Sequence, residues 1–302
     1  MTSRLDQKPA EPLIVQDLVK TYNISGQSPV QAVRGVSFSL NEGEVFGLLG
    51  PNGAGKTSII STIVTLETPT SGQIFVNGFN NQIDSRAAKQ NVGFVPQEII
   101  NHGYFNVEEI LDFQSGYYGL YKNKERIDYL LNELSLYEHR NKKVKQLSGG
   151  MKRRLLIAKS LVHSPKLLLL DEPTAGVDIE LRSQLWEFVK VLKKQGVTIL
   201  LTTHYLEEAE FLCDRVGLLD RGELKLVGET KDLIRKYTMR KVQIKCRNQI
   251  EPLEFIIKSG EPIGELLLKE KLNVEAIEDI NISEGNLEDA FREVIFNRED
   301  NA

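Results

Sequence analysis

The N-terminal part of the chain alternates short apolar runs with turn-forming residues. Between Leu13 and Leu40, two strand-like runs flank a turn at Asn23–Pro29, and a third run follows at Gln73–Gly78. Runs of this length, separated by Gly, Pro, Asn and Ser, are typical of strands joined by turns. The pattern therefore predicts a small antiparallel sheet. Asn91–Pro96 is expected to be another strand, which the proline ends.

Strand and helix patterns alternate further along the chain. The apolar runs Leu167–Leu170 and Val197–Leu201 enclose a segment with leucine and valine at helical spacing, at Leu181, Leu185, Val189 and Leu192. This alternation predicts a mostly parallel sheet covered by helices. Lys124–Leu136 has the spacing of an amphipathic helix, so we expect a helical insert at about residues 97–160. The fold class is therefore α/β.

The pattern changes near Lys231. From there to the end of the chain the signals are mixed, which predicts a small α+β extension over residues 231–302, separate from a main domain at 12–230. The last segment is expected to be a helix with Asn286 as its N-cap, because Glu288 and Asp289 follow in the first turn, where the helix dipole favours acids.

Composition narrows the possible functions. The formal net charge of −4 argues against a general nucleic-acid binder, so no nucleic acid is expected as a partner. Cys213 and Cys246 lack the spacing of a metal site and are expected to be reduced thiols. The polar N-terminal stretch does not resemble a signal peptide, and no apolar run approaches 18 residues. We therefore expect no membrane-spanning segment.

The segment Gly50–Thr57 fits the pattern G-x-x-x-x-G-K-[ST] and lies between the strand-like run Glu44–Leu49 and a helical start at Ser58. A strand, a glycine-rich turn and a helix N-terminus aim backbone N–H groups and the positive end of the helix dipole at one anion. The alternative is a glycine-rich surface turn. The expected phosphate ligands are Gly50, Pro51, Asn52, Gly53, Ala54, Gly55, Lys56, Thr57 and Ser58, with Lys56 at the β- and γ-phosphates and Thr57 also on Mg²⁺.

Two acids end the apolar strand at Leu168–Leu170. Acids at the carboxyl end of a central parallel strand point into the crevice where ligands bind. We expect Asp171 to hold Mg²⁺ and Glu172 to orient and polarise the attacking water as general base. Taken alone, such acids are more often caps or turn residues. The neighbouring phosphate loop favours the catalytic interpretation.

A second candidate anion site precedes the helix Met151–Val162. Ser148, Gly149 and Gly150 would expose N–H donors at the start of that helix. Lys152, Arg153 and Arg154 follow at the helix end where the dipole disfavours cations, a cost that a nearby negative ligand would reverse. An ordinary capped helix with solvated basic residues is the alternative.

Together these segments resemble the ATP-binding subunits of ABC transporters over residues 12–230. Gly50–Thr57 resembles the Walker A loop, Leu147–Gly150 the family signature and Leu167–Glu172 Walker B. Ala175–Asp178 resembles the D-loop of the family. Three single residues match further motifs: Gln97 the Q-loop, His204 the switch histidine and Tyr22 an aromatic that stacks on adenine.

The resemblance implies a P-loop NTPase fold and a role for each of these residues. Gln97 would sense Mg²⁺ and the partner subunit, His204 would contact the γ-phosphate, and Asp178 would line the nucleotide interface. Three of these residues have an alternative: Gln97 as a plain loop residue, His204 as a structural histidine, and Tyr22 as packing on the small sheet. Met151 departs from the family, which most often has glutamine there.

The resemblance also implies partners. Two copies of the chain would pack head to tail around ATP and Mg²⁺, with Ser148 of one copy completing the phosphate loop of the other. The helical insert would grip an integral membrane permease at the cytoplasmic face of the membrane.

Leu147–Leu155, Ala175–Leu181, His204–Glu210 and the tail Leu287–Phe291 resemble the subfamily that powers ABC-2 type exporters of drugs, polysaccharides or antibiotics. The alternatives are an importer, or a soluble ABC ATPase acting on ribosomes or DNA.

Overall fold

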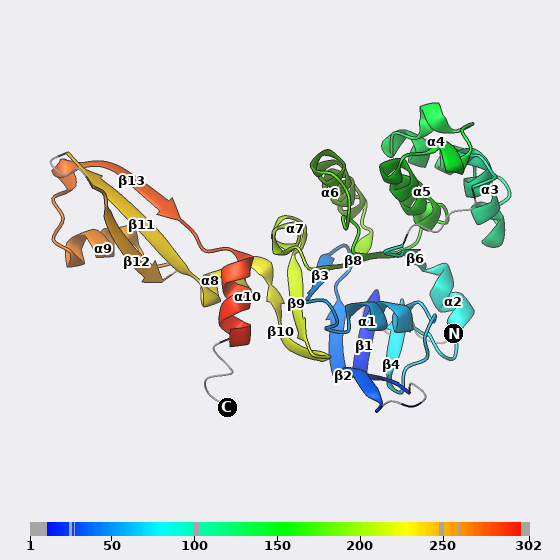
Figure 1. Ribbon diagram of the computed structural model, residues 1–302, viewed down its shortest axis with the longest axis horizontal. Coiled ribbons are helices and arrows are strands. Elements are labelled where there is room, and N and C mark those ends of the chain that lie inside the picture. Colours follow the sequence, from blue (N-terminus) through cyan, green and yellow to red (C-terminus); the bar gives the residue numbers. More distant parts are fainter. Residues whose placement is uncertain are drawn as a thin grey trace, which may run out of the picture. The chain divides into compact units, whose positions relative to one another are not determined.

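The computed structural model describes residues 11–23, 26, 28–98, 103–247, 251–258 and 260–296. The chain separates into two compact units between Val227 and Gly228. The N-terminal unit combines a parallel-rich sheet, an antiparallel sheet and a cluster of helices (Figure 1). The α/β prediction is confirmed.

A six-stranded sheet forms the centre of the N-terminal unit. Its order is β10-β9-β3-β8-β7-β6, and the pairs β9/β3, β3/β8, β8/β7 and β7/β6 are parallel. The residues of β3, β7 and β8 are all buried, as expected for strands covered on both faces. The strands are β3 (Val45–Leu49), β6 (Val92–Val95), β7 (Leu167–Asp171), β8 (Thr198–Thr203), β9 (Arg215–Asp220) and β10 (Glu223–Glu229).

Helices follow these strands in the chain. The predicted apolar stripe of α6 is buried, at Leu181, Leu185, Val189 and Leu192. The helices are α1 (Lys56–Ile63), α2 (Ser85–Gln90), α6 (Ile179–Lys194) and α7 (Leu206–Leu212).

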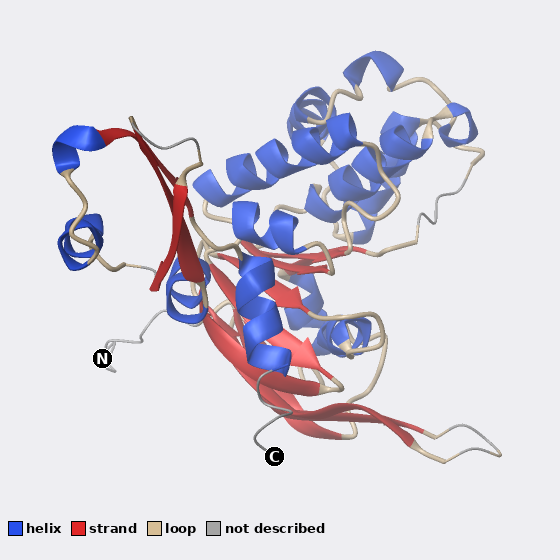
Figure 2. Cartoon of the chain, turned by 60° about the vertical axis from the view of Figure 1, so that its left-hand side comes forward, coloured by secondary structure: helices blue, strands red, loops and turns tan. Residues whose placement is uncertain are grey.

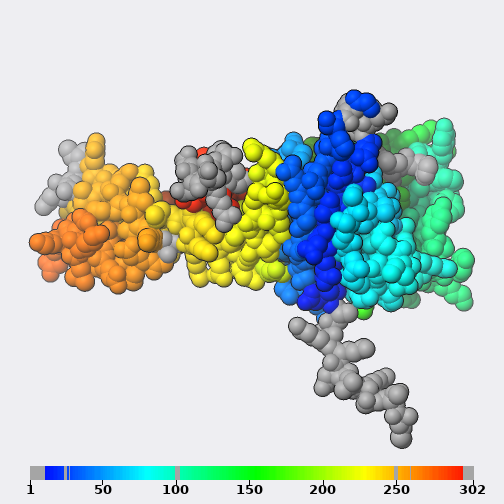
Figure 3. Space-filling model, turned by 90° about the horizontal axis from the view of Figure 1, so that it is seen from below, coloured from blue at the N-terminus to red at the C-terminus, as the bar shows by residue number. Residues whose placement is uncertain are grey.

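The predicted antiparallel sheet is present, with the order β2-β1-β4-β5. Its strands β1, β2 and β4 lie side by side on the surface of the unit (Figure 3). Phe38 of this sheet stacks on Phe46 of the central sheet at 5.3 Å between ring centroids, so the two sheets share one hydrophobic core. The strands are β1 (Leu13–Tyr22), β2 (Val30–Leu40), β4 (Ser71–Val76) and β5 (Phe79–Asn80).

The insert is helical, as predicted. It contains α3 (Val107–Tyr117), α4 (Lys124–Glu133), α5 (Gly149–Leu161) and the 3₁₀ turns Tyr137–His139 and Val144–Gln146. A capping box between Asn106 and Glu109 starts α3. The helix expected to reach Leu136 ends at Glu133, because Ser135 adopts a left-handed backbone with φ of 51°.

The C-terminal unit has a three-stranded antiparallel sheet, order β12-β11-β13, which forms a narrow twisted ribbon (Figure 2). Val242, Ile244, Ile257 and Leu266 form its core. The predicted cap of the last helix is confirmed, because the Asp289 amide donates to Asn286 Oδ1 at 2.9 Å. The elements are α8 (Thr230–Tyr237), β11 (Met239–Cys246), β12 (Leu253–Lys258), α9 (Ile263–Lys269), a 3₁₀ turn (Val274–Ala276), β13 (Ile277–Ser283) and α10 (Leu287–Phe296).

Within the described ranges, every helix is too short or too polar to cross a bilayer.

Candidate functional site

The phosphate loop connects the end of β3 to the start of α1. Two of its glycines pack where no side chain fits: a Cβ on Gly50 would lie 2.2 Å from the Leu219 carbonyl oxygen, and one on Gly55 would lie 2.4 Å from that of Ala32. Gly55 also has a φ of 108°, which L-residues rarely adopt. The loop is therefore held in one shape at the N-terminus of α1, where the first amides have no helical acceptor and an anion can bind.

Lys56 lies inside this loop with 5% of its side chain exposed. Its ammonium group donates to the carbonyl oxygens of Gly50 at 2.7 Å and Pro51 at 3.1 Å, and lies 3.8 Å from Glu172 Oε1. Burial lowers the pKa of Lys56, and the charges of Glu172 and Asp171 oppose that shift. Phosphate oxygens placed in the loop would favour the charged ammonium further.

Asp171 ends β7, and the parallel register places it opposite Thr202 of β8. Thr202 Oγ1 donates to Asp171 Oδ1 at 2.6 Å, and the Thr57 hydroxyl is a second hydrogen-bond partner of this carboxylate. Burial raises the pKa of Asp171, while these hydrogen bonds oppose the rise. A buried carboxylate beside a hydroxyl provides the hard oxygen donors that Mg²⁺ prefers, so Asp171 and Thr57 fit that ion.

Glu172 is the point at which the candidate catalytic side chains meet. Its Oε2 lies 3.2 Å from His204 Nδ1 and 3.4 Å from Gln97 Nε2, while Oε1 faces Lys56. Only 11% of the Glu172 side chain is exposed. The structure thus brings Lys56, Gln97 and His204, which are far apart in sequence, to the carboxylate of Glu172.

The predicted second anion site forms a separate cleft of about 480 Å³. Ser148 is the N-cap of α5 and accepts from the Met151 amide at 3.3 Å, and Asp178 is the N-cap of α6 and accepts from the Leu181 amide at 2.8 Å. Ser148, Gly149, Gly150 and Asp178 line the cleft together with Gln97, whereas none of Gly50–Ser58 does. The structure therefore places the two candidate anion sites apart within one chain, with Gln97 beside both.

Two of the three cations that the sequence places at the start of α5 bind backbone carbonyl oxygens. Arg153 is 3% exposed and its guanidinium group binds backbone carbonyl oxygens, so it does not await a negative ligand. Arg154 donates to the Leu134 carbonyl oxygen at 3.2 Å. The helical spacing of Arg153 with Ile157 and Leu161, four and eight residues later, was the signal that it faces inward.

Tyr22 lies at the end of β1 beside the phosphate loop. Its hydroxyl donates to Ser58 Oγ at 3.2 Å, and the Lys20 ammonium lies 4.8 Å from its ring centroid. These contacts place an aromatic ring next to the start of α1. Stacking on adenine stays a prediction.

Sequence reasoning did not identify Thr202. Besides holding Asp171, its hydroxyl and carbonyl oxygens each accept from the Glu172 amide at 3.1 Å. Its position two residues before His204, which directly follows the same strand, was a signal, because residues two apart in an extended segment share a face.

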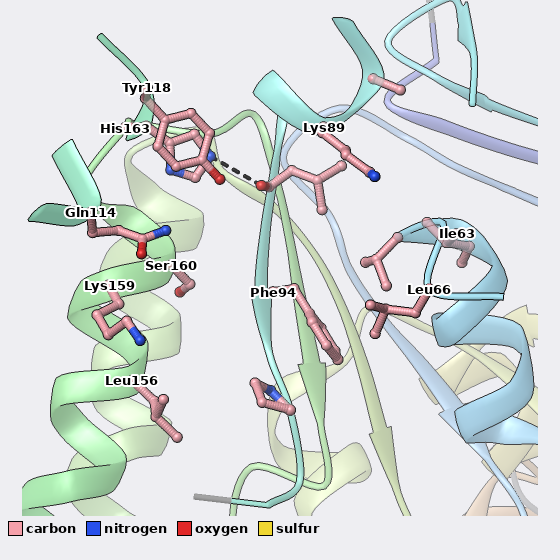
Figure 4. A pocket seen from close by; sticks show the side chains of 14 residues that line it. Ile63, Leu66, Lys89, Phe94, Gln114, Tyr118, Leu156, Lys159, Ser160 and His163 are labelled. Atoms are coloured by element: carbon pink, nitrogen blue, oxygen red, sulfur yellow. Dashed lines mark hydrogen bonds between the residues drawn. The ribbon is translucent and has the colours of Figure 1, made fainter. Parts of the chain in front are cut away.

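A further cavity of about 440 Å³ lies between β6, α1 and the helical insert (Figure 4). Ile63, Leu66, Phe94 and Leu156 contribute apolar side chains to its wall. At one end, the rings of Tyr118 and His163 stack 3.7 Å apart, and His163 Nε2 is hydrogen-bonded to the Val92 carbonyl oxygen at 3.0 Å. Burial lowers the pKa of His163 to about 4, so this histidine is neutral at pH 7. None of the predicted nucleotide ligands lines the cavity.

Comparison with known proteins agrees with this geometry. A family model described as ABC transporter matches residues 33–175. The linearmycin resistance ATP-binding protein LnrL of Bacillus subtilis (strain 168) is 46% identical over 203 residues, which are 67% of this chain and 65% of that protein. The Nod factor export ATP-binding protein I of Rhizobium etli is 43% identical over 220 residues, 72% of this chain and 68% of that protein. The chain thus spans about two thirds of the length of these relatives.

Among solved structures, a dimeric ATP-binding cassette in a post-hydrolysis state, bound to ADP and Pi, superposes with a TM-score of 0.64. It is 26% identical, and the match covers 72% of this chain and 98% of that one.

Proposed function

The chain belongs to the ATP-binding proteins of ABC transporters, and we propose that it is the ATP-hydrolysing motor subunit of an exporter. The observation that carries the proposal is the convergence of Lys56, Gln97 and His204 on Glu172, beside the paired oxygens of Asp171 and Thr57. A carboxylate held next to a phosphate-binding loop is placed to accept a proton from a water molecule.

Each residue then has one task. Lys56 and the amides at the start of α1 hold the β- and γ-phosphates, and Asp171 and Thr57 hold Mg²⁺. When it is bound, Mg²⁺ would neutralise negative charge on the phosphates. Glu172 orients the attacking water and takes its proton, while His204 contacts the γ-phosphate from the carboxyl end of the adjacent parallel strand β8. The Lys56 ammonium group lies 3.8 Å from Glu172 Oε1.

We propose that two copies pack head to tail, so that the cleft around Ser148 and Asp178 in one copy closes the phosphate loop of the other. The separation of the two anion sites within one chain supports this arrangement, because one copy cannot bring both to the same phosphate. The dimeric assembly of the similar cassette bound to ADP and Pi also supports it. ATP then stabilises the closed dimer, and hydrolysis releases it.

Export through a separate permease at the cytoplasmic face of the membrane is the remaining part of the proposal. The relatives named for linearmycin resistance and Nod factor export support an exporter of drug-like, polysaccharide or lipid-like compounds. The helical insert carries exposed aromatic side chains, with Tyr104, Tyr117 and Tyr121 more than 80% exposed. Large exposed aromatic side chains are typical of a surface that another protein covers.

The dimer is tested with Glu172→Gln. This change keeps the shape of the side chain but removes its basicity, so ATP should remain bound and hold two copies together. Light scattering with ATP and Mg²⁺ should give twice the mass of the chain, and phosphate release should fall about 100- to 10,000-fold. The surface variant Glu187→Gln, whose native residue pairs with exposed Lys190, is the control. A Glu172→Gln chain that binds ATP yet stays monomeric rules out the dimer.

Export is tested in membranes. Purification of the chain from detergent extracts should recover an integral membrane partner, and inside-out vesicles containing both proteins should accumulate an amphiphilic compound in an ATP-dependent manner. Accumulation only in right-side-out vesicles would identify an importer. Recovery of ribosomes or DNA in place of a membrane protein would overturn the transport proposal.

A further inference from the structure

Arg153 is a buried arginine on α5 that the proposed reaction does not use directly. Its side chain is 3% exposed and lies on the inward face of the helix with Ile157 and Leu161. A buried guanidinium group is costly unless its donors find partners, and burial lowers the pKa of Arg153 while Asp171 and Glu208 oppose that shift. The groups that bind this guanidinium therefore show which part of the structure Arg153 stabilises.

The partners are five backbone carbonyl oxygens. A guanidinium group has five N–H donors in a planar fork, and here every donor position is used. Nε donates to Pro173 at 3.0 Å, Nη1 to Pro96 at 2.6 Å and Gln97 at 3.1 Å, and Nη2 to Asp171 at 3.2 Å and Glu172 at 2.9 Å.

These carbonyl oxygens belong to the ends of two adjacent strands. The parallel pairing of β6 with β7 ends at Val95 and Leu170. Beyond this pair, the two segments of the chain continue without further strand pairing. The guanidinium group of Arg153 connects them at that point. It thereby sets the spacing that lets the Gln97 amide reach Glu172 Oε2 at 3.4 Å.

Arg153 also holds the strained backbone of Glu172. Glu172 has a φ of 45°, in the left-handed region that a residue with a side chain occupies at a cost. Thr202 accepts from its amide, and Arg153 donates to its carbonyl oxygen. Such a conformation persists only when its surroundings hold it at both ends.

The same helix begins with the second anion site. Ser148 caps α5, and Arg153 follows five residues later on a continuous helix. We propose that Arg153 is a positioning residue that links the anion site at the start of α5 to Glu172 and Gln97 of the same chain. Engagement of Ser148 by the nucleotide of the second copy is thereby transmitted to the catalytic carboxylate. This inference rests on the proposed function, because it needs the head-to-tail dimer.

The test is Arg153→Lys in the full-length chain. Lysine keeps the charge but has three donors and no planar fork, so it cannot hold both strand ends. We expect kcat for ATP hydrolysis to fall at least tenfold while KM stays within twofold, because the phosphate loop is untouched. Arg126→Gln is the matched control, since Arg126 also donates to a carbonyl oxygen, that of Leu161, but away from these strand ends. It should leave kcat within twofold.

A double-mutant cycle separates positioning from general destabilisation. If Arg153 acts through Glu172, Arg153→Lys should lower the residual turnover of Glu172→Gln less than twofold. Arg153→Gln, which retains an amide donor, is the second variant and should show the same pattern. All rates are normalised to the fraction of chain that binds ATP, so partial unfolding does not imitate the effect.

Two results would overturn the inference: losses from Arg153→Lys and Glu172→Gln that multiply, or a kcat of Arg153→Lys within twofold of the unchanged chain. Failure of the proposed function has a different signature. In that case Glu172→Gln itself would turn over ATP normally, or would not form a dimer with ATP, whatever residue stands at position 153.

Discussion

The two candidate anion sites of this chain are built in different ways. The phosphate-loop site has buried charged groups: Lys56 and Asp171 are buried, and Lys56, Gln97 and His204 lie close to Glu172. In the cleft around Ser148, the polar residues Ser148 and Asp178 are exposed, and each side chain accepts a hydrogen bond from the backbone of its own helix. A loop with a buried ammonium group can bind phosphate alone, whereas an exposed helix start needs a second surface to exclude water.

Removing Lys56 should have the largest effect on this comparison. Lys56→Ala removes a buried ammonium group from the phosphate position, and charge-assisted hydrogen bonds contribute about 1.5–3 kcal/mol each. We expect the Kd for ATP, measured by calorimetry on the monomeric chain, to rise about 100-fold. Lys193→Ala, which removes a lysine paired with Asp214, should leave that Kd within twofold. An unchanged Kd in Lys56→Ala would show that the phosphates bind elsewhere.

Changing Ser148 should have a smaller and different effect. Ser148→Arg places a long cationic side chain in the open cleft, so the Kd for ATP of the monomer should stay within twofold while kcat falls about 30-fold, which corresponds to about 2 kcal/mol. Calorimetry and steady-state hydrolysis measure the two quantities on the same sample. A matching loss of monomer affinity would mean that both sites act on one phosphate within one chain, which contradicts the comparison.

Thr202→Val should have the smallest effect. It tests the hydrogen bond that Thr202 donates to Asp171 in the phosphate-loop site. The Thr202 hydrogen bond lowers the pKa of Asp171 against the rise that burial causes, so its removal raises this pKa further. Because the protonated acid binds Mg²⁺ poorly, the acid limb of kcat/KM should move to higher pH.

The control for Thr202→Val lies on the same strand. Thr198 accepts from the Gly43 amide at 2.9 Å at the other end of β8, and Thr198→Val should leave the pH profile unchanged. Equal shifts in both variants would assign the effect to the strand as a whole and not to the bond with Asp171.

Most of the fold was predictable because its signals are local. Turn residues between apolar runs predicted the antiparallel sheet, and helical spacing predicted the buried stripe of α6. Boundaries were less accurate, as at the end of α4, where Ser135 adopts a left-handed conformation that the apolar spacing does not indicate. The assignment of residues 12–230 to an ATPase domain, of 97–160 to its helical subdomain and of 231–302 to an accessory domain stays a prediction.

The sequence by itself determined which chemistry this protein carries. Glycine spacing, a lysine and a hydroxyl at the start of a helix specify a phosphate site wherever the segment folds, because the donors belong to one short stretch of backbone. Only the tertiary structure decided which residues contact and position Glu172. The inward direction of Arg153, the bond from Thr202 to Asp171 and the separation of the Ser148 cleft depend on strand order and helix packing, which join residues far apart in the chain.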